Sequence, residues 1–203
     1  MAQETTKILF EELAKNQDDL RLFLGLHFGF DEFFRTLSAE FLEKILCPAL
    51  KASANNRKLS PSLLCQPAMQ KGYLLTITAQ GHWPKDWEVV LGKEGDFIFA
   101  GIYTKAEAEQ NNFEELKSSL MRSMNLKFPE EKIQTNPKAK GVWFFYSSPY
   151  QNWKTEEGVL KLAQEVAAVN GGAQSGSEMS FTWRYVEDLL ALAEIVDEVY
   201  AAG

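Results

Sequence analysis

Residues 141–153, GVWFFYSSPYQNW, form the densest aromatic block of the chain. The β-branched and aromatic residues at 142–146 favour a mostly buried strand. Residues 147–149, SSP, interrupt this run and predict a turn. Tyr150 and Trp153 follow, where a half-exposed ring either closes a core or contacts a partner. The block therefore predicts a central strand that leads into an aromatic turn.

Three further runs of β-branched and apolar residues precede this block and predict strands: residues 73–79, 87–91 and 97–103. The connection at 92–96, GKEGD, has the length and glycine content of a hairpin loop. Short connections favour antiparallel pairing. Together with residues 142–146, these runs predict a central antiparallel sheet of about four strands.

Four segments carry apolar residues at helical spacing, and we expect each to form a helix: residues 31–45, 106–126, 156–169 and 182–201. Pro48 is expected to end the first of them, because a proline inside a helix removes a hydrogen bond. The fold class is therefore α+β, with N-terminal helices, helices packed on one face of the sheet and a C-terminal helix.

We expect the chain to form one α+β domain, residues 1–203. Its parts are a helical N-terminal part at 1–50, a sheet-and-helix core at 72–169, a flexible linker at 170–179 and a C-terminal helix at 180–203. Residues 49–71 are polar and contain two prolines, so they predict a solvated loop between the first two parts.

The C-terminal helix has a narrow apolar seam and an acidic back. Residues 178–203 hold six acidic residues and one arginine. A helix joined through a flexible linker either docks on its own domain or binds another protein. Its acidic residues at the expected partner-binding surface are Glu187, Glu194, Asp197 and Glu198.

The net charge of −7 disfavours nucleic acid as a partner, because binding to the phosphate backbone needs clustered lysines and arginines. A local basic group, which leaves a nucleic-acid contact as a third hypothesis, consists of Lys51, Arg57, Lys58 and Lys71. No apolar run reaches the roughly 18 residues of a membrane span, and the acidic N-terminal sequence is unlike a signal peptide. We therefore expect a cytoplasmic protein without membrane contact.

The two cysteines, Cys47 and Cys65, lack the spacing and the companion histidines of a metal site. We expect them to be reduced and structural, with a disulfide as the alternative. The histidines are His27, in an apolar helical segment, and His82, in a turn. Neither belongs to a zinc-binding or triad pattern, so we expect no metal and no cofactor.

Exposed aromatic residues give a further indication of function, since Trp and Tyr are frequent in binding hot spots. We expect Trp83, Tyr150 and Trp153 to contribute to the partner-binding surface. The leading hypothesis is a non-catalytic, acidic protein-binding module of a prokaryote or phage, such as an inhibitor, immunity or other defence-related protein. Its partner would be a basic protein, because complementary charge raises association rates. The oligomeric state stays open.

A metal-dependent nuclease is the alternative hypothesis. Such enzymes place a carboxylate and an acid-x-lysine motif on neighbouring strands, so that two carboxylates hold Mg²⁺ and the lysine supports the attacking water. The residues that fit best are Asp86 or Asp96 with Glu130 and Lys132. Residues 130–132 follow a proline in a polar connection, which is not the strand that this chemistry needs.

Three segments, ILFEEL at 8–13, VWFFY at 142–146 and NW at 152–153, occur in an order that resembles certain prokaryotic proteins of the PD-(D/E)xK nuclease superfamily. The resemblance extends over residues 87–199 and a short N-terminal patch. It implies a small sheet with helices that closes in an aromatic strand, a tryptophan before a capped helix, and a last helix. The Asp…(Asp/Glu)-x-Lys core of that family has no convincing counterpart here. The resemblance therefore implies an accessory domain or a relative without nuclease chemistry.

Overall fold

The structure is a computed structural model that describes residues 29, 32–57, 59, 63–70, 73–79, 82–83, 87–94, 97–104, 113–128, 133–135, 142–146, 153, 155–170 and 181–201. The chain divides into two compact units, Met1–Leu37 and Ser38–Gly203. In the first unit residues 32–37 are helical, and the Arg35 guanidinium donates to both carboxylate oxygens of Glu32 at 2.7 Å. All the described strands belong to the second unit.

The second unit begins with a helical segment that changes its hydrogen-bonding pattern midway. Residues 38–41 are α-helical, Leu42–Leu46 form the π-helix η1, and Cys47–Asn56 form the α-helix α3. The expectation that Pro48 ends this helix is wrong. Pro48 lies in the first turn of α3, where its missing N–H is tolerated. The wider π-turn before it, in which the Cys47 N–H donates to the Leu42 carbonyl, carries the chain into α3.

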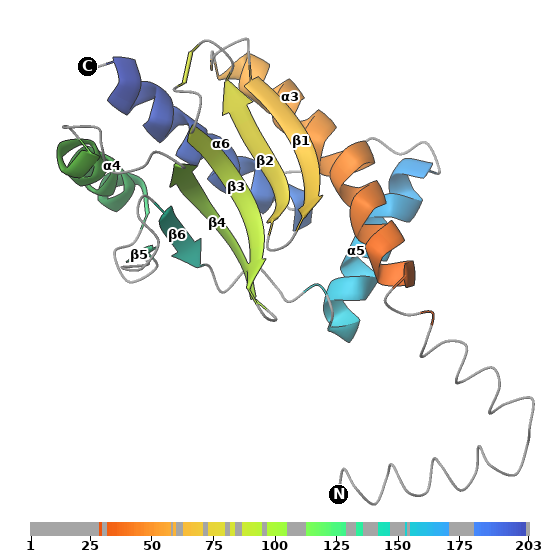
Figure 1. The fold of residues 1–203 in the computed structure, drawn as a ribbon. Helices are drawn as coiled ribbons and strands as arrows, with labels where there is room; N and C mark the ends of the chain where they lie inside the picture. Colours follow the sequence, from red (N-terminus) through yellow and green to blue (C-terminus); the bar gives the residue numbers. More distant parts are fainter. Residues whose placement is uncertain are drawn as a thin grey trace, which may run out of the picture. The chain divides into compact units, whose positions relative to one another are not determined.

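A six-stranded sheet lies at the centre of this unit, in the order β1-β2-β3-β4-β6-β5 (Figure 1). Its strands are β1 Leu63–Gln70, β2 Tyr73–Ala79, β3 Trp87–Glu94, β4 Phe97–Thr104, β5 Ile133–Thr135 and β6 Val142–Tyr146. Every neighbouring pair is antiparallel. The α+β class and the four expected strands are confirmed, and the described residues add two more, β1 and β5.

These two additional strands form the edges of the sheet. Within the described residues, β1 pairs only with β2 and β5 only with β6. The expectation of a solvated loop at residues 49–71 is wrong, because α3 and β1 occupy most of that segment. Pro67 lies inside β1, and an edge strand tolerates a proline because one of its sides needs no ladder donor. The proline that suggested a loop is therefore compatible with an edge.

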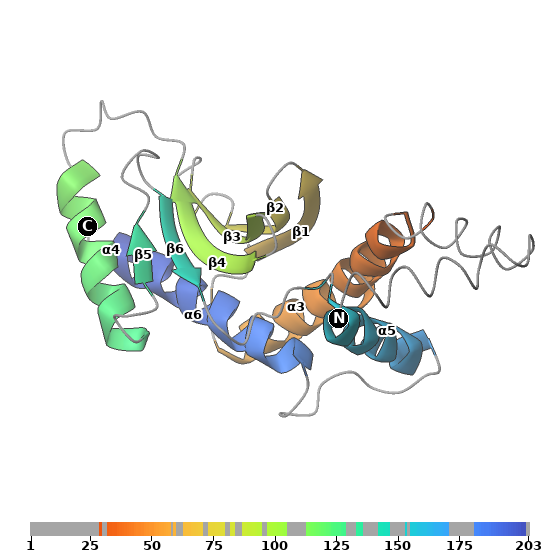
Figure 2. The same cartoon turned by 90° about the horizontal axis from the view of Figure 1, so that it is seen from below.

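Three more helices complete the described fold, namely α4 Phe113–Lys127, α5 Glu156–Asn170 and α6 Phe181–Ala201. The contacts of α6 with β3 and β4, and of α3 with β1, put both helices on the same face of the sheet (Figure 2). The helix α4 packs against α6, and α5 packs against η1. The Thr155 hydroxyl accepts a hydrogen bond from the Gly158 N–H at 3.1 Å and caps the N-terminus of α5.

Side chains on the two faces of the sheet pack differently. On the helix-covered face, Leu75, Leu91 and Ala100 are aligned across β2, β3 and β4, and all three are buried. On the other face Gly92 is paired with Phe99, and a Cβ added to the glycine would lie 2.3 Å from the Phe99 Cζ atom. The Phe99 ring thus covers a position where only glycine fits without a shift.

A disulfide joins Cys47, the first residue of α3, to Cys65 in β1, with 5.7 Å between their Cα atoms. The expectation of two reduced cysteines is wrong for this structure. Cys65 is aligned with Ile77 of β2, which is buried under the helices, and residues aligned across a sheet share a face. The strand register therefore turns the Cys65 side chain towards α3.

Candidate functional site

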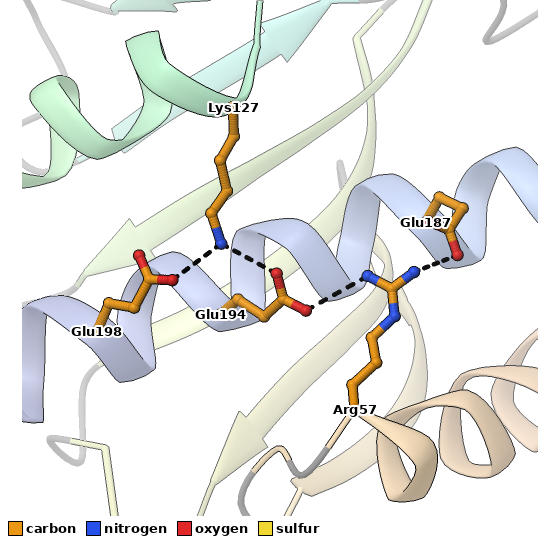
Figure 3. Close-up of polar contacts among 5 residues, drawn as sticks. All are labelled: Arg57, Lys127, Glu187, Glu194 and Glu198. Atoms are coloured by element: carbon orange, nitrogen blue, oxygen red, sulfur yellow. Dashed lines mark hydrogen bonds and ion pairs between the residues drawn. The ribbon is translucent and has the colours of Figure 1, made fainter.

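Five charged residues form a continuous row of ion pairs along α6 (Figure 3). The Arg57 guanidinium pairs with Glu187 and also with Glu194, whose Oε1 lies 3.3 Å from Nη1. The Lys127 ammonium lies 2.9 Å from Glu194 Oε2 and 3.1 Å from Glu198 Oε1. Glu194 therefore lies between two cations, and all three glutamates have partners within their own chain.

The two cations of this row come from the ends of other helices. Arg57 directly follows α3, and Lys127 is the last residue of α4, so each also suits the negative end of its helix dipole. Burial lowers the pKa of Arg57 and of Lys127, but the paired glutamates outweigh it and the net pKa of each is raised. Both side chains are therefore charged at neutral pH and hold α6 to α3 and to α4.

Asp197 is engaged by a turn that follows β2. The backbone N–H groups of His82 and Trp83 donate to the Ala79 carbonyl at 3.2 and 2.9 Å. This turn directs the Trp83 indole to α6, where its Nε1–H donates to Asp197 Oδ1 at 2.5 Å. His82 Nε2 lies 3.5 Å from the same oxygen. Trp83 is only 5% exposed, so the expectation of an exposed tryptophan is wrong here.

Trp153 belongs to a buried aromatic cluster at the other end of α6. Its Nε1–H donates to the Tyr185 hydroxyl oxygen at 2.8 Å, and its side chain is 1% exposed. Phe41 packs edge-on against both rings, with centroids 5.4 Å from Trp153 and 6.4 Å from Tyr185. Burial raises the pKa of the Tyr185 hydroxyl. The expectation of an exposed Trp153 is wrong, because this ring is part of the core.

The acidic face of α6 is thus occupied by its own chain. The sequence left two alternatives for α6, docking on its own domain or binding another protein. In the structure α6 docks on its own domain. The residues expected at a partner surface that have partners in the chain are Glu187, Glu194, Asp197 and Glu198. Tyr150 lies outside the described residues. A binding role for these side chains stays a prediction, and the exposure that motivated it is absent at Trp83 and Trp153.

The other sequence-derived candidates are described only in part. The residues outside the described ranges are the nuclease candidates Asp86, Asp96, Glu130 and Lys132, the bases Lys58 and Lys71, and His27. Arg57 is engaged by α6, as above, and Lys51 is exposed. Within the ranges that are described, no group of three or more His, Cys, Asp or Glu side chains is placed to hold a metal ion.

A different site, which the sequence analysis did not anticipate, lies between α3 and β1. Here a cavity of about 330 Å³ opens to the surface. Its floor is apolar and buried, and consists of Leu50 and Ala54 of α3, Ile77 of β2 and Leu190 of α6. We call this site the α3–β1 groove.

The mouth of the α3–β1 groove is exposed and carries charge of both signs. Its exposed lining residues are Glu43, Pro48, Lys51 and Leu64. The Cys47–Cys65 disulfide also lines the groove, and both cysteines are half-buried. The groove therefore has a buried apolar floor, a disulfide in its wall and a charged opening.

The edge of the sheet runs along this groove. Leu64 and Gln66 of β1 are exposed and alternate with the half-buried Leu63 and Cys65, which face the helices. Because β1 pairs only with β2 in the described part of the chain, its outer side offers backbone N–H and C=O groups. Leu64, 38% exposed, is an apolar side chain at this edge and at the mouth of the groove.

Comparison with protein-family models, with curated proteins and with solved structures found no match. Among the described residues, no helix combines the length and the apolar character that crossing a bilayer requires. The described structure thus offers two sites, the row of ion pairs on α6 and the α3–β1 groove.

Proposed function

We propose that this protein is a non-catalytic protein-binding module that holds an extended segment of a partner protein along β1. The observation that carries the proposal is the coincidence of an open strand edge and an apolar cavity in the α3–β1 groove. Segments that add a strand to a sheet gain affinity from backbone hydrogen bonds and specificity from pockets for alternate side chains. The edge supports the first contribution and the cavity the second.

The length of β1 suits an extended partner segment. The strand has eight residues, which span about 26 Å at the usual rise per residue. Pro67 has no N–H to offer, so we expect the segment to pair chiefly with residues 63–66. Every second side chain of such a segment would point to the helix-covered face, where the groove lies.

The size of the cavity suits one large apolar side chain of that segment. Its volume of about 330 Å³ stands near the lower end of ligand pockets, which run from roughly 300 to 1,000 Å³. Leu50, Ala54 and Ile77 offer no polar group on the floor beyond the backbone. An aliphatic or aromatic anchor would gain about 1.5–3 kcal/mol from leaving water.

The charge of the protein favours a basic partner. The net charge of −7 attracts a basic partner over long range, and Glu43 at the mouth supports a lysine or arginine beside the anchor. The narrower proposal, an inhibitor or immunity protein whose target binds nucleic acid, rests on the same acidity, because such targets present basic surfaces. The glutamates of α6 that already have partners contribute to this field but are not offered as contacts.

Selection from a phage-displayed library of random linear peptides on the immobilised full-length protein tests the proposal. We expect enrichment of sequences with one large apolar residue, extended alternation and neighbouring Lys or Arg. The enriched peptides should lose at least tenfold in affinity for Ala54→Phe, which fills the cavity, and for Glu43→Lys, which places a repelling charge beside their Lys or Arg. Leu126→Ser, at an 83% exposed position on α4, is the matched control and should bind as the parent does.

Three outcomes would overturn the proposal. Enriched peptides that bind Ala54→Phe and Glu43→Lys as tightly as the parent would place the site elsewhere. If a synthetic peptide of residues 1–28 displaces every enriched peptide, the groove belongs to the chain's own N-terminal segment. If the protein is a dimer by analytical ultracentrifugation and Leu64→Arg dissociates it, the occupant is a second copy.

A further inference from the structure

We propose that the Cys47–Cys65 disulfide is a site of reversible thiol–disulfide exchange with a dithiol reductant, and that its oxidation holds the α3–β1 groove in its binding shape. The first half of the proposal concerns the disulfide alone. The second half rests on the proposed function, because it states how the affinity of that same groove is regulated.

Access supports the exchange reaction. Both cysteines are half-buried, and both line a cavity that opens to the surface. A buried structural disulfide would need unfolding before a reductant could approach it. Here an attacking thiolate can reach a sulfur through the mouth of the groove, where Glu43 and Lys51 are the charged residues that line the groove in the described part of the chain.

Position supports the regulatory role. Cys47 begins α3 and Cys65 lies in β1, so the bond joins the two walls of the groove. The two residues are 18 apart in sequence, and β1 is an edge strand held on one side by β2. Breaking the bond removes the covalent link between an edge strand and the helix opposite it, and an edge strand is paired with the sheet on one side only.

The exchange consumes one equivalent of dithiol. A reductant thiolate attacks one sulfur of the pair, the Cys47–Cys65 bond breaks, and the released cysteine thiolate takes a proton. The second thiol of the reductant then attacks the mixed disulfide and releases the other cysteine as a thiol. The protein gains two electrons and two protons, and the dithiol leaves as its own disulfide.

The oxidised form is the one that binds. With the bond in place, the cavity walls are fixed at the spacing that receives the anchor, so little order has to be imposed on binding. After reduction, β1 moves more freely relative to α3, and a segment must restore that spacing itself. We expect reduction to weaken binding of a library-selected peptide by about tenfold or more.

Reduction of the native protein by dithiothreitol tests the first half. Samples are quenched with iodoacetamide without denaturant, and intact mass spectrometry counts the modified cysteines. We expect two alkylated cysteines per chain and a reduction rate that rises in proportion to dithiothreitol concentration. A rate that does not depend on the concentration would mean that global unfolding limits reduction, and would overturn the proposal. The Cys47→Ser/Cys65→Ser variant gives the zero-modification baseline.

Hydrogen exchange with mass spectrometry tests the second half in the absence of any peptide. We expect reduction to speed exchange in residues 63–70 and 47–56, while residues 113–127 of α4 keep their rates. Unchanged exchange in β1 would overturn the regulatory role even if reduction is facile. Because neither readout uses a ligand, both retain their meaning if the peptide selection fails, and only the affinity comparison depends on it.

Discussion

The acidic face of α6 and the α3–β1 groove lie in the same unit, but they differ in whether their polar groups already have partners within the chain. On α6 every glutamate of the row has a cation from another helix, and Asp197 has the Trp83 indole. In the groove, a strand edge, an apolar floor and exposed charged side chains lie together. The first region is closed by its own chain and the second is open.

The difference separates residues that build the fold from residues that can recognise a partner. Charged residues on a helix attract attention in a sequence, but here their partners are the ends of α3 and α4. Substitutions on the closed side should therefore change stability and leave binding alone. Substitutions on the open side should change binding and leave stability alone.

The largest effect is expected at Trp153. Replacing this 1% exposed ring by alanine in Trp153→Ala should lower the free energy of unfolding by about 3–5 kcal/mol, because it opens a large cavity in the core. Urea denaturation measures the change, with Leu126→Ala as the exposed control. A loss below about 1 kcal/mol would contradict the core role, since surface substitutions fall in that range.

A smaller effect is expected at the partner of Trp153. Tyr185→Phe removes the hydroxyl that accepts from the indole and leaves a buried N–H without that acceptor, which should cost about 1–3 kcal/mol. The same denaturation experiment gives the value. A stability equal to that of the parent would show that the Trp153–Tyr185 hydrogen bond does not hold α6.

The pH dependence of the same pair gives a separate check. Burial raises the pKa of Tyr185 above its ordinary value of 10.0, so the unfolded chain ionises first as the pH rises. The contribution of this tyrosine is therefore complete below pH 10 and is lost above it, as the pH approaches the raised folded pKa. We expect Tyr185→Phe to lose less stability between pH 9 and pH 11 than the parent protein. Other groups that titrate at high pH, such as Lys127, are present in both proteins and cancel in the comparison. Equal losses of stability would therefore contradict the raised pKa of Tyr185.

The row of ion pairs should contribute less than the core. Glu194→Gln removes the carboxylate that joins Arg57 and Lys127, and we expect a loss of about 1 kcal/mol, because solvent screens these part-exposed pairs. The loss should shrink in 1 M NaCl. The control is Glu157→Gln, which breaks an exposed pair with Lys161 and should cost about 0.3 kcal/mol. Equal effects of the two substitutions would mean that the row is no more than ordinary surface charge.

The smallest effect on stability is expected on the open side. Leu64→Ser changes an exposed residue of β1 and should alter the free energy of unfolding by less than about 0.5 kcal/mol. Its effect should appear in binding, as an affinity for the library-selected peptides that isothermal titration calorimetry finds at least fivefold weaker. A stability loss with unchanged affinity would reverse the comparison between the two regions.

What the sequence predicted well are the elements with long or strong local patterns. The hairpin of β3 and β4, the strand β6 and the helix α6 follow from periodicity and β-branched runs, and a glycine-rich loop marks the hairpin. Such signals depend on neighbouring residues, so they predict an element without knowledge of its long-range contacts.

What the sequence missed depends on distant residues. Glu187 meets Arg57 across 130 positions and Glu194 meets Lys127 across 67, so nothing local indicated that the acids were satisfied. Trp83 and Trp153 donate to residues of α6, far along the chain, and Trp153 also packs against Phe41, which lies far before it. Because of Pro67 and the polar residues near it we expected a loop in place of β1, so the groove was not predicted and the disulfide was only the alternative to reduced cysteines.

The most direct test of the binding account is hydrogen exchange of the oxidised protein with and without a saturating library-selected peptide. The account predicts that exchange in residues 63–66 of β1 slows at least tenfold, while α4 and the charged face of α6 keep their rates. Protection on α6 with no change in β1 would contradict it, and would return the acidic helix to the partner-binding role that the sequence suggested.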